Sequence, residues 1–217
     1  MIIKVNNINL YYEMIGRGEP LIMVHGNGET HEIFQEAVEV LSKHFTCYLI
    51  DSRGHGQSEP VKEFHYEDMA EDMYQFIKER KLQNVTYFGF SDGGIIGIIL
   101  AAKHPDLLKR MIISGANTNP KGMKWYFVWY FSVLNKFRKD PLVDLMLNEP
   151  NITKEQLQKI TVPTLVLAGS KDCVKEEDTK FIASSIPNAR LKILEGEKHE
   201  TYIVHSVKIA ELILGYK

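Results

Sequence analysis

Short apolar runs alternate with helical patterns along most of this 217-residue chain. Continuous apolar runs are typical of strands buried on both faces of a sheet, and apolar positions three or four residues apart indicate helices. We therefore predict strands at residues 2–5, 8–12, 21–24, 45–50, 85–90, 111–113, 164–168 and 191–194, and helices at 33–41, 69–77, 95–102 and 204–214. The alternation predicts an α/β fold with a mostly parallel eight-stranded sheet and helices on both faces.

The alternation stops between residues 117 and 161, where aromatic side chains are dense. We interpret residues 117–161 as a short lid inserted into a single core domain made of residues 1–116 and 162–217. Within it, residues 125–137 are expected to line an apolar pocket, with Trp125 and Trp129 as substrate contacts. A plain core helix, or an interfacial or dimer-forming patch, remains an alternative for this stretch.

Composition narrows the class of protein. With 44% apolar and 25% charged residues, the chain has the balance of one globular domain. Its net charge is −2, and its lysines and arginines are scattered, which argues against a nucleic-acid partner. No apolar stretch approaches the ~20 residues that span a bilayer, and no export signal is recognisable, so a cytoplasmic protein is expected, as a monomer or homodimer. Cys47 and Cys173 have no metal-binding spacing and are expected to be free thiols.

A nucleophile is predicted at Ser91. Residues 89–93 read Gly-Phe-Ser-Asp-Gly and lie between a predicted strand and a predicted helix, which is the context of a nucleophile elbow. The glycines on both sides allow the strand and the helix to approach closely around a strained serine. A purely structural glycine-rich turn is the alternative.

A serine hydroxyl needs a base within hydrogen-bond reach and an acid that orients the base. In chains with this elbow the acid follows a late strand and the histidine follows the last one. Asp172 and His199 occupy those two positions and are predicted to complete a triad with Ser91. Glu195 and Glu197 are alternative acids, since Asp172 also suits a turn.

Acyl transfer also requires N–H donors for the oxyanion. One donor comes from the residue after the nucleophile and one from the loop after an early strand. The backbone N–H groups of Asp92 and of Asn27, in the His-Gly-Asn-Gly loop at residues 25–28, are predicted for this role.

Together these motifs resemble the α/β-hydrolase superfamily. Residues 25–28 look like its oxyanion motif, residues 51–58 look like its D-x-R-G-x-G-x-S loop, and residues 162–172 are similar to the strand that delivers the acid. Residues 89–94, 101–105 and 114–117 most resemble the biphenyl-hydrolase-like group, to which valacyclovir hydrolase belongs, although the segment 117–161 is short for the lid of that group. The resemblance implies the α/β-hydrolase fold.

The expected reaction is hydrolysis of a small carboxylic ester through an acyl-enzyme, without metal or cofactor. The Asp92 side chain is also a predicted substrate contact: a carboxylate beside the nucleophile would favour α-amino acid esters, unless it turns away toward neighbouring groups. A carbon–carbon bond hydrolase, a lactonase or a thioesterase would use the same triad, and a non-catalytic ligand receptor is the alternative from another class.

Overall fold

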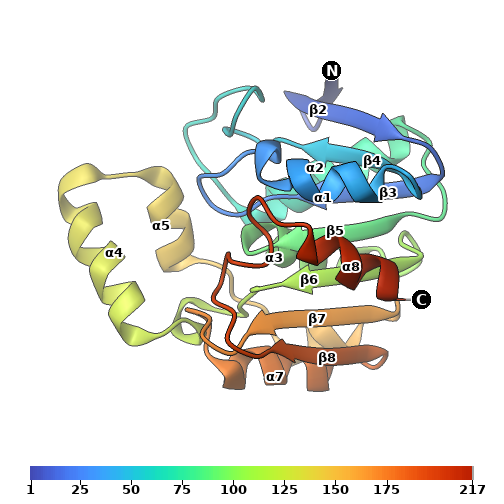
Figure 1. The fold of residues 1–217 in the computed structure, drawn as a ribbon. Coiled ribbons are helices and arrows are strands. Elements are labelled where there is room, and N and C mark those ends of the chain that lie inside the picture. The colour runs from blue at the N-terminus through green and yellow to red at the C-terminus, as the bar shows by residue number, and fades with distance from the viewer. Residues whose placement is uncertain (217) are drawn as a thin grey trace.

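The computed structural model describes residues 1–216 and is built on one sheet (Figure 1). The strands are β1 (Ile2–Val5), β2 (Ile8–Gly16), β3 (Glu19–Val24), β4 (Phe45–Ile50), β5 (Thr86–Phe90), β6 (Arg110–Ser114), β7 (Thr164–Gly169) and β8 (Ala189–Leu194). Their order is β1-β2-β4-β3-β5-β6-β7-β8. Strand β2 pairs antiparallel with β1 and β4, and the other pairs are parallel. The predicted eight-stranded, mostly parallel sheet is confirmed.

The helices are α1 (Gln35–Leu41), α2 (Tyr66–Glu79), α3 (Asp92–Lys103), α4 (Trp125–Arg138), α5 (Pro141–Asn148), α6 (Lys154–Gln158), α7 (Glu176–Ser185) and α8 (Lys208–Gly215), with 3-10 turns at His31–Phe34 and Pro120–Gly122. Helix α7 has no counterpart in the sequence prediction. The last helix begins four residues later than predicted, because His205 adopts a positive φ of 49° that interrupts helical geometry.

Two apolar cores cover the two faces of the sheet. Along β3, Ile22 and Val24 face the core formed with α2, α3, α6 and α7, and Leu21 and Met23 face the core formed with α1 and α8. Successive strand residues point to opposite faces, so a strand covered on both sides must be apolar at every position. This explains why the central strands read as continuous apolar runs.

Helices α4 and α5 stand apart from the sheet and pack against each other (Figure 1). Helix α6, at the end of the predicted lid, instead contacts α3 and α7 of the core. The segment that carries α4 and α5 leaves the core and returns to it at adjacent points, since the Ile152 N–H donates a hydrogen bond of 2.8 Å to the Thr118 carbonyl. In the described part of the chain, no helix has the length and apolar character needed to cross a membrane.

Candidate active site

Ser91 lies at the turn between β5 and α3 in a strained conformation, with φ 52° and ψ −112°. The turn depends on its glycines. A Cβ at Gly89 would lie 2.1 Å from the Gly93 carbonyl oxygen, and a Cβ at Gly93 would lie 2.1 Å from that of Val24. Neither approach is possible for another residue without moving the backbone, so the strand-turn-helix expected of a nucleophile elbow is present.

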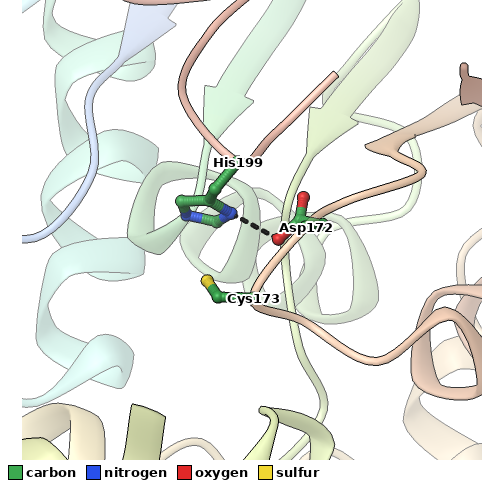
Figure 2. A group of neighbouring side chains, drawn as sticks. All are labelled: Asp172, Cys173 and His199. Carbon is green, nitrogen blue, oxygen red and sulfur yellow. Dashed lines mark hydrogen bonds and ion pairs between the residues drawn. The ribbon is translucent and has the colours of Figure 1, made fainter. Parts of the chain in front are cut away.

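The structure brings the three predicted triad residues together. Ser91 follows β5, Asp172 follows β7 and His199 follows β8, and the carboxyl ends of these parallel strands share one edge of the sheet. His199 Nε2 lies 3.0 Å from Ser91 Oγ, and its Nδ1 lies 2.7 Å from Asp172 Oδ1 (Figure 2). Both distances are within hydrogen-bond reach. Glu195 and Glu197, the alternative acids, instead contact Ser170, Lys208 and Thr201.

Electrostatics favour a charged pair between the acid and the histidine. Burial by itself would raise the pKa of Asp172, but hydrogen bonds from His199 and from the Val174 N–H outweigh it, and the pKa lies below its usual value. Burial likewise would lower the pKa of His199, but the interactions with Asp172 and Cys173 hold it well above its usual value. Asp172 therefore stabilises an imidazolium at His199.

Cys173 lies beside this pair (Figure 2). The potential metal-ligand atoms of Asp172, Cys173 and His199 lie within 4.8 Å of one another, the one such group among residues 1–216. The Nδ1 of His199 is already hydrogen-bonded to Asp172, so a metal there would compete with the contact that orients the imidazole. The donor set thus suits a triad better than a metal centre.

Gly115 is a site residue that the sequence analysis did not single out. It follows β6 with a positive φ of 65°, and a Cβ there would lie only 2.6 Å from His199 Cε1. The ring of Phe90 lies on the histidine as well, with centroids 4.9 Å apart. Two signals for Gly115 were available: its place in the 114–117 stretch that resembles the family, and its position directly after a neighbouring strand at the edge that carries Ser91.

The predicted oxyanion donors both lie beside Ser91, where they line the same cavity. Within residues 1–216, neither the Asn27 N–H nor the Asp92 N–H donates to another protein group. The loop that carries Asn27 passes close to the nucleophile, since a Cβ at Gly26 would lie 3.0 Å from Ser91 Cβ. Both N–H groups are therefore available to a substrate oxygen.

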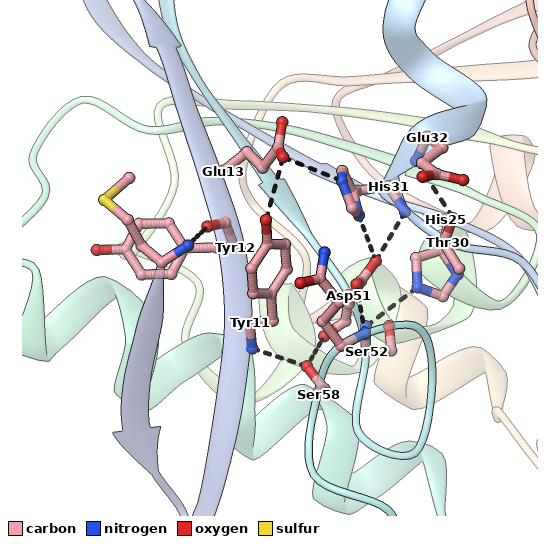
Figure 3. A network of polar contacts seen from close by, with 12 residues as sticks. Tyr11, Tyr12, Glu13, His25, Thr30, His31, Glu32, Asp51, Ser52 and Ser58 are labelled. Atoms are coloured by element: carbon pink, nitrogen blue, oxygen red, sulfur yellow. Dashed lines mark hydrogen bonds and ion pairs between the residues drawn. The ribbon is translucent and has the colours of Figure 1, made fainter.

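A buried polar network fixes the oxyanion loop from behind (Figure 3). The His25 imidazole accepts a hydrogen bond from the Ser52 N–H at 3.0 Å and contacts the Gly26 carbonyl at 2.8 Å. Burial and the neighbouring His55 lower the pKa of His25 to about 4, which keeps it neutral and able to accept. Asp51 accepts from the N–H and the ring of His31 at 2.8 and 2.7 Å. The 51–58 loop thus supports the site without reaching it.

The Asp92 carboxylate turns toward neighbouring protein groups. Its Oδ1 accepts from the Tyr66 hydroxyl at 2.8 Å, and its Oδ2 accepts from the Asn27 side chain at 3.0 Å. Burial raises the pKa of Asp92, although both hydrogen bonds oppose the shift. Of the two orientations considered from the sequence, the structure has the one in which Asp92 bonds to groups near the elbow. The carboxylate still forms part of the cavity wall.

A cavity of about 340 Å³ opens over Ser91. Phe127 and Phe131 of α4 and Met146 of α5 form its apolar wall. Its described lining also includes three carboxylates and no lysine or arginine; the carboxylates belong to Glu29, Asp92 and Glu200. The cavity can therefore take a compact acyl group and would favour a positive charge over a negative one.

The structure does not place Trp125 and Trp129 in this cavity. They line a separate groove of about 960 Å³, and Met123 is shared by the two. A step of two residues rotates the side-chain direction by about 200° around a helix. Trp125 and Trp129 therefore lie on the side of α4 opposite to Phe127 and Phe131. The dense aromatic block provided no means of deciding which face would be turned inward.

Comparisons with known proteins agree with this fold. Residues 19–145 match the family model described as alpha/beta hydrolase fold. "Serine hydrolase BPHL" of Mus musculus is 27% identical over 93% of this chain and 80% of its own length. An esterase from Exiguobacterium antarcticum superposes with a TM-score of 0.87 at 23% identity, covering 99% of this chain and 98% of that one. An enol-lactonase from Burkholderia xenovorans superposes with a TM-score of 0.82 at 20% identity, over 100% and 99% of the two chains.

The predicted family and fold class are therefore confirmed, including the likeness to the biphenyl-hydrolase-like group. The chain is an enzyme of the α/β-hydrolase fold family.

Proposed function

We propose that this enzyme hydrolyses small carboxylic esters through an acyl-enzyme on Ser91. The observation that carries the proposal is the hydrogen-bonded chain from Ser91 through His199 to Asp172 beside two unused backbone N–H groups. The esterase structure and the mouse serine hydrolase described above support it as relatives of the same architecture.

The reaction would proceed in two steps. Ser91 Oγ attacks the ester carbonyl as His199 Nε2 takes its proton, and the imidazolium is stabilised by Asp172. The N–H groups of Asn27 and Asp92 hold the developing oxyanion, and His199 returns the proton to the leaving alcohol. Water activated by the same histidine then attacks the acyl-enzyme, releasing the acid and restoring Ser91.

The decisive experiment is pre-steady-state hydrolysis of an activated ester. Wild-type enzyme should release a burst of about one alcohol per active site, followed by a slower steady rate, because acylation precedes deacylation. Ser91→Ala should abolish the burst and lower kcat by several orders of magnitude, and Ser91→Ala/His199→Ala should be little worse than the single variant. Binding of the ester without any Ser91-dependent release of alcohol in the wild type would instead identify a ligand receptor.

The same experiment can show which type of bond the enzyme cleaves best, since all the candidate reactions would use the same triad. Matched ester, lactone, thioester and carbon–carbon bond substrates should be run in parallel with wild type and Ser91→Ala. We expect the ester to give the highest Ser91-dependent kcat/KM, since the cavity is compact and apolar on the side of α4 and α5. A higher value for another class would reassign the reaction while keeping the site.

A finer proposal is a preference for esters with an ammonium group near the carbonyl. It is supported by the carboxylates of Glu29, Asp92 and Glu200 in a described cavity lining without lysine or arginine. A partly shielded ion pair there would contribute ~1 to 3 kcal/mol, or roughly 5- to 150-fold in selectivity.

The test of the finer proposal compares kcat/KM for a valine ester and its des-amino analogue. We expect the wild type to prefer the valine ester, and we expect Asp92→Asn and Glu29→Gln to reduce the preference several-fold. If wild type and both variants treat the two esters alike, the acidic wall has no part in selectivity.

A further inference from the structure

Helix α4 exposes large apolar side chains on its outer face. With about 100° between successive residues, positions 125, 126, 129, 130, 133 and 137 fall within an arc of about 140°. This outer stripe of α4 consists of Trp125, Tyr126, Trp129, Tyr130, Val133 and Phe137, and all six are exposed. Trp125, Trp129 and Phe137 are 75%, 62% and 84% exposed. A helix at the surface of a globular protein ordinarily turns a polar side outward, so an apolar stripe on the outer face of α4 is unusual.

The inner side of α4 is already occupied. Phe127 and Phe131 line the cavity over Ser91, and α4 packs against α5. Figure 1 shows this helix pair projecting from the body of the molecule, with α4 outermost. The outer stripe is therefore largely uncovered within the described chain, although Trp125 and Trp129 border the groove beside α5.

The charged side chains of the segment that carries the stripe are all of one sign, up to Asp140 at the start of α5. Residues 121–139 contain Lys121, Lys124, Lys136, Arg138 and Lys139 and no aspartate or glutamate. The chain as a whole has a net charge of −2, so this cationic segment departs from the rest of the molecule. The cations lie at both ends of α4 and flank the aromatic stripe rather than interrupting it, except for Lys136 at its edge.

We propose that the outer stripe of α4 docks on the surface of an anionic lipid membrane. Tryptophan and tyrosine are the side chains best suited to the headgroup region, because each has an apolar ring with a polar tip. Lysine and arginine beside them attract acidic lipids, at about 1 kcal/mol for each cation near the surface. Helix α4 has 14 residues and is about 21 Å long, so it would lie in the interface and not cross it.

The same charges argue against a second copy of this chain as the occupant. Two α4 helices packed antiparallel would bring Lys121 and Lys124 of one copy beside Lys136, Arg138 and Lys139 of the other, an excess of positive charge that the single carboxylate of Asp140 does not balance. Like charges at an interface core are unfavourable, whereas an anionic membrane neutralises them.

The chain carries its own probe for this surface. Its two tryptophans are Trp125 and Trp129, so all tryptophan fluorescence comes from the outer stripe. On titration with phosphatidylcholine vesicles containing phosphatidylserine, we expect the emission to shift to shorter wavelength and the protein to float with the vesicles. Phosphatidylcholine alone should bind much more weakly. Salt near ~1 M, where the screening length is about 3 Å, should release the protein from anionic vesicles.

Charge-reversal variants distinguish electrostatic docking from nonspecific hydrophobic adsorption. Lys136→Glu/Arg138→Glu/Lys139→Glu should weaken binding to anionic vesicles by at least about tenfold. The matched control Lys154→Glu/Lys159→Glu/Lys192→Glu makes the same charge change at exposed positions outside the segment and should bind nearly as the wild type does. Neither set touches the residues around Ser91, so hydrolysis of a water-soluble ester should be unchanged in both.

Three results would overturn the proposal. The first is an unchanged emission with either vesicle, and the second is equal weakening by the two triple variants. The third is a wavelength shift that depends on protein concentration without lipid, together with a dimer in sedimentation, which would make the stripe an interface between copies. None of these readouts requires catalysis, so they are independent of the proposed ester hydrolysis.

Discussion

Two opposing effects set the pKa of His199. Burial disfavours its charged form, but Asp172 at 2.7 Å favours it more strongly, and the net result is a pKa well above the usual value. In the proposed reaction the neutral imidazole is the form that accepts a proton from Ser91, and the charged form is inactive as a base. A raised pKa therefore moves activity toward higher pH.

We expect kcat/KM to rise with pH through one ionisation that lies above the ordinary histidine value of about 6.5. The measurement is a pH–rate profile with an activated ester whose leaving group does not titrate in the range. In Asp172→Asn the rise should move to lower pH, because the stabilising charge is lost, and kcat should fall because the tautomer is no longer fixed. A flat wild-type profile from acid to neutral pH would remove His199 from the role of base.

The residues that the sequence identified and those that it missed differ in a physical way. Ser91, Asp172 and His199 each follow a strand in a recognisable local pattern, and parallel strands deliver them to one edge. Gly115 matters through the distance of its missing side chain to His199, and the orientation of Asp92 depends on Tyr66. Such contacts join distant parts of the chain and leave no local pattern.

At the scale of elements, burial explains which helices could be predicted. Helix α3 is apolar over most of its length, whereas the buried residues of α7 are Thr179, Ile182 and Ser185, of which one is hydrophobic. Without an apolar stripe, α7 had no helical periodicity to detect. Helix α4 poses the opposite problem, since aromatic residues on every side conceal which face is buried.

Substitutions on the two faces of α4 should differ in their effect on acyl-chain preference. Phe131→Ala removes part of the cavity wall and should lower the ratio of kcat/KM for a butyrate ester to that for an acetate ester by up to about tenfold, given ~0.8 kcal/mol for each buried CH₂ group. Trp125→Ala and Trp129→Ala should leave the ratio within about twofold, because both residues line the other groove. The reverse pattern would restore the tryptophans as acyl contacts, as first expected from the sequence.

At the scale of the whole molecule, the mostly parallel sheet could be predicted from the apolar runs and the helical patterns between them, whereas the strand order, with β4 between β2 and β3, could not. Continuous runs require both faces of the sheet to be covered, and the two cores of this structure cover them. The break in the alternation at residues 117–161 indicated that this segment differs from the rest, and α4 and α5 lie within it. Its tertiary arrangement could not be predicted, because that depends on packing between α4, α5 and the loops around Ser91.

The hydrogen bond between Ile152 and Thr118 has a consequence for how such a molecule can change over evolutionary time. Because the chain leaves the core and returns to it at adjacent points, the residues between Thr118 and Ile152 form one segment whose two ends are held side by side. A segment of this kind accepts insertions and deletions more readily than a strand of the sheet does, because its ends are already held together. If the two proposals made for α4 hold, evolution could change both the accepted substrate and the docking surface by altering this one segment.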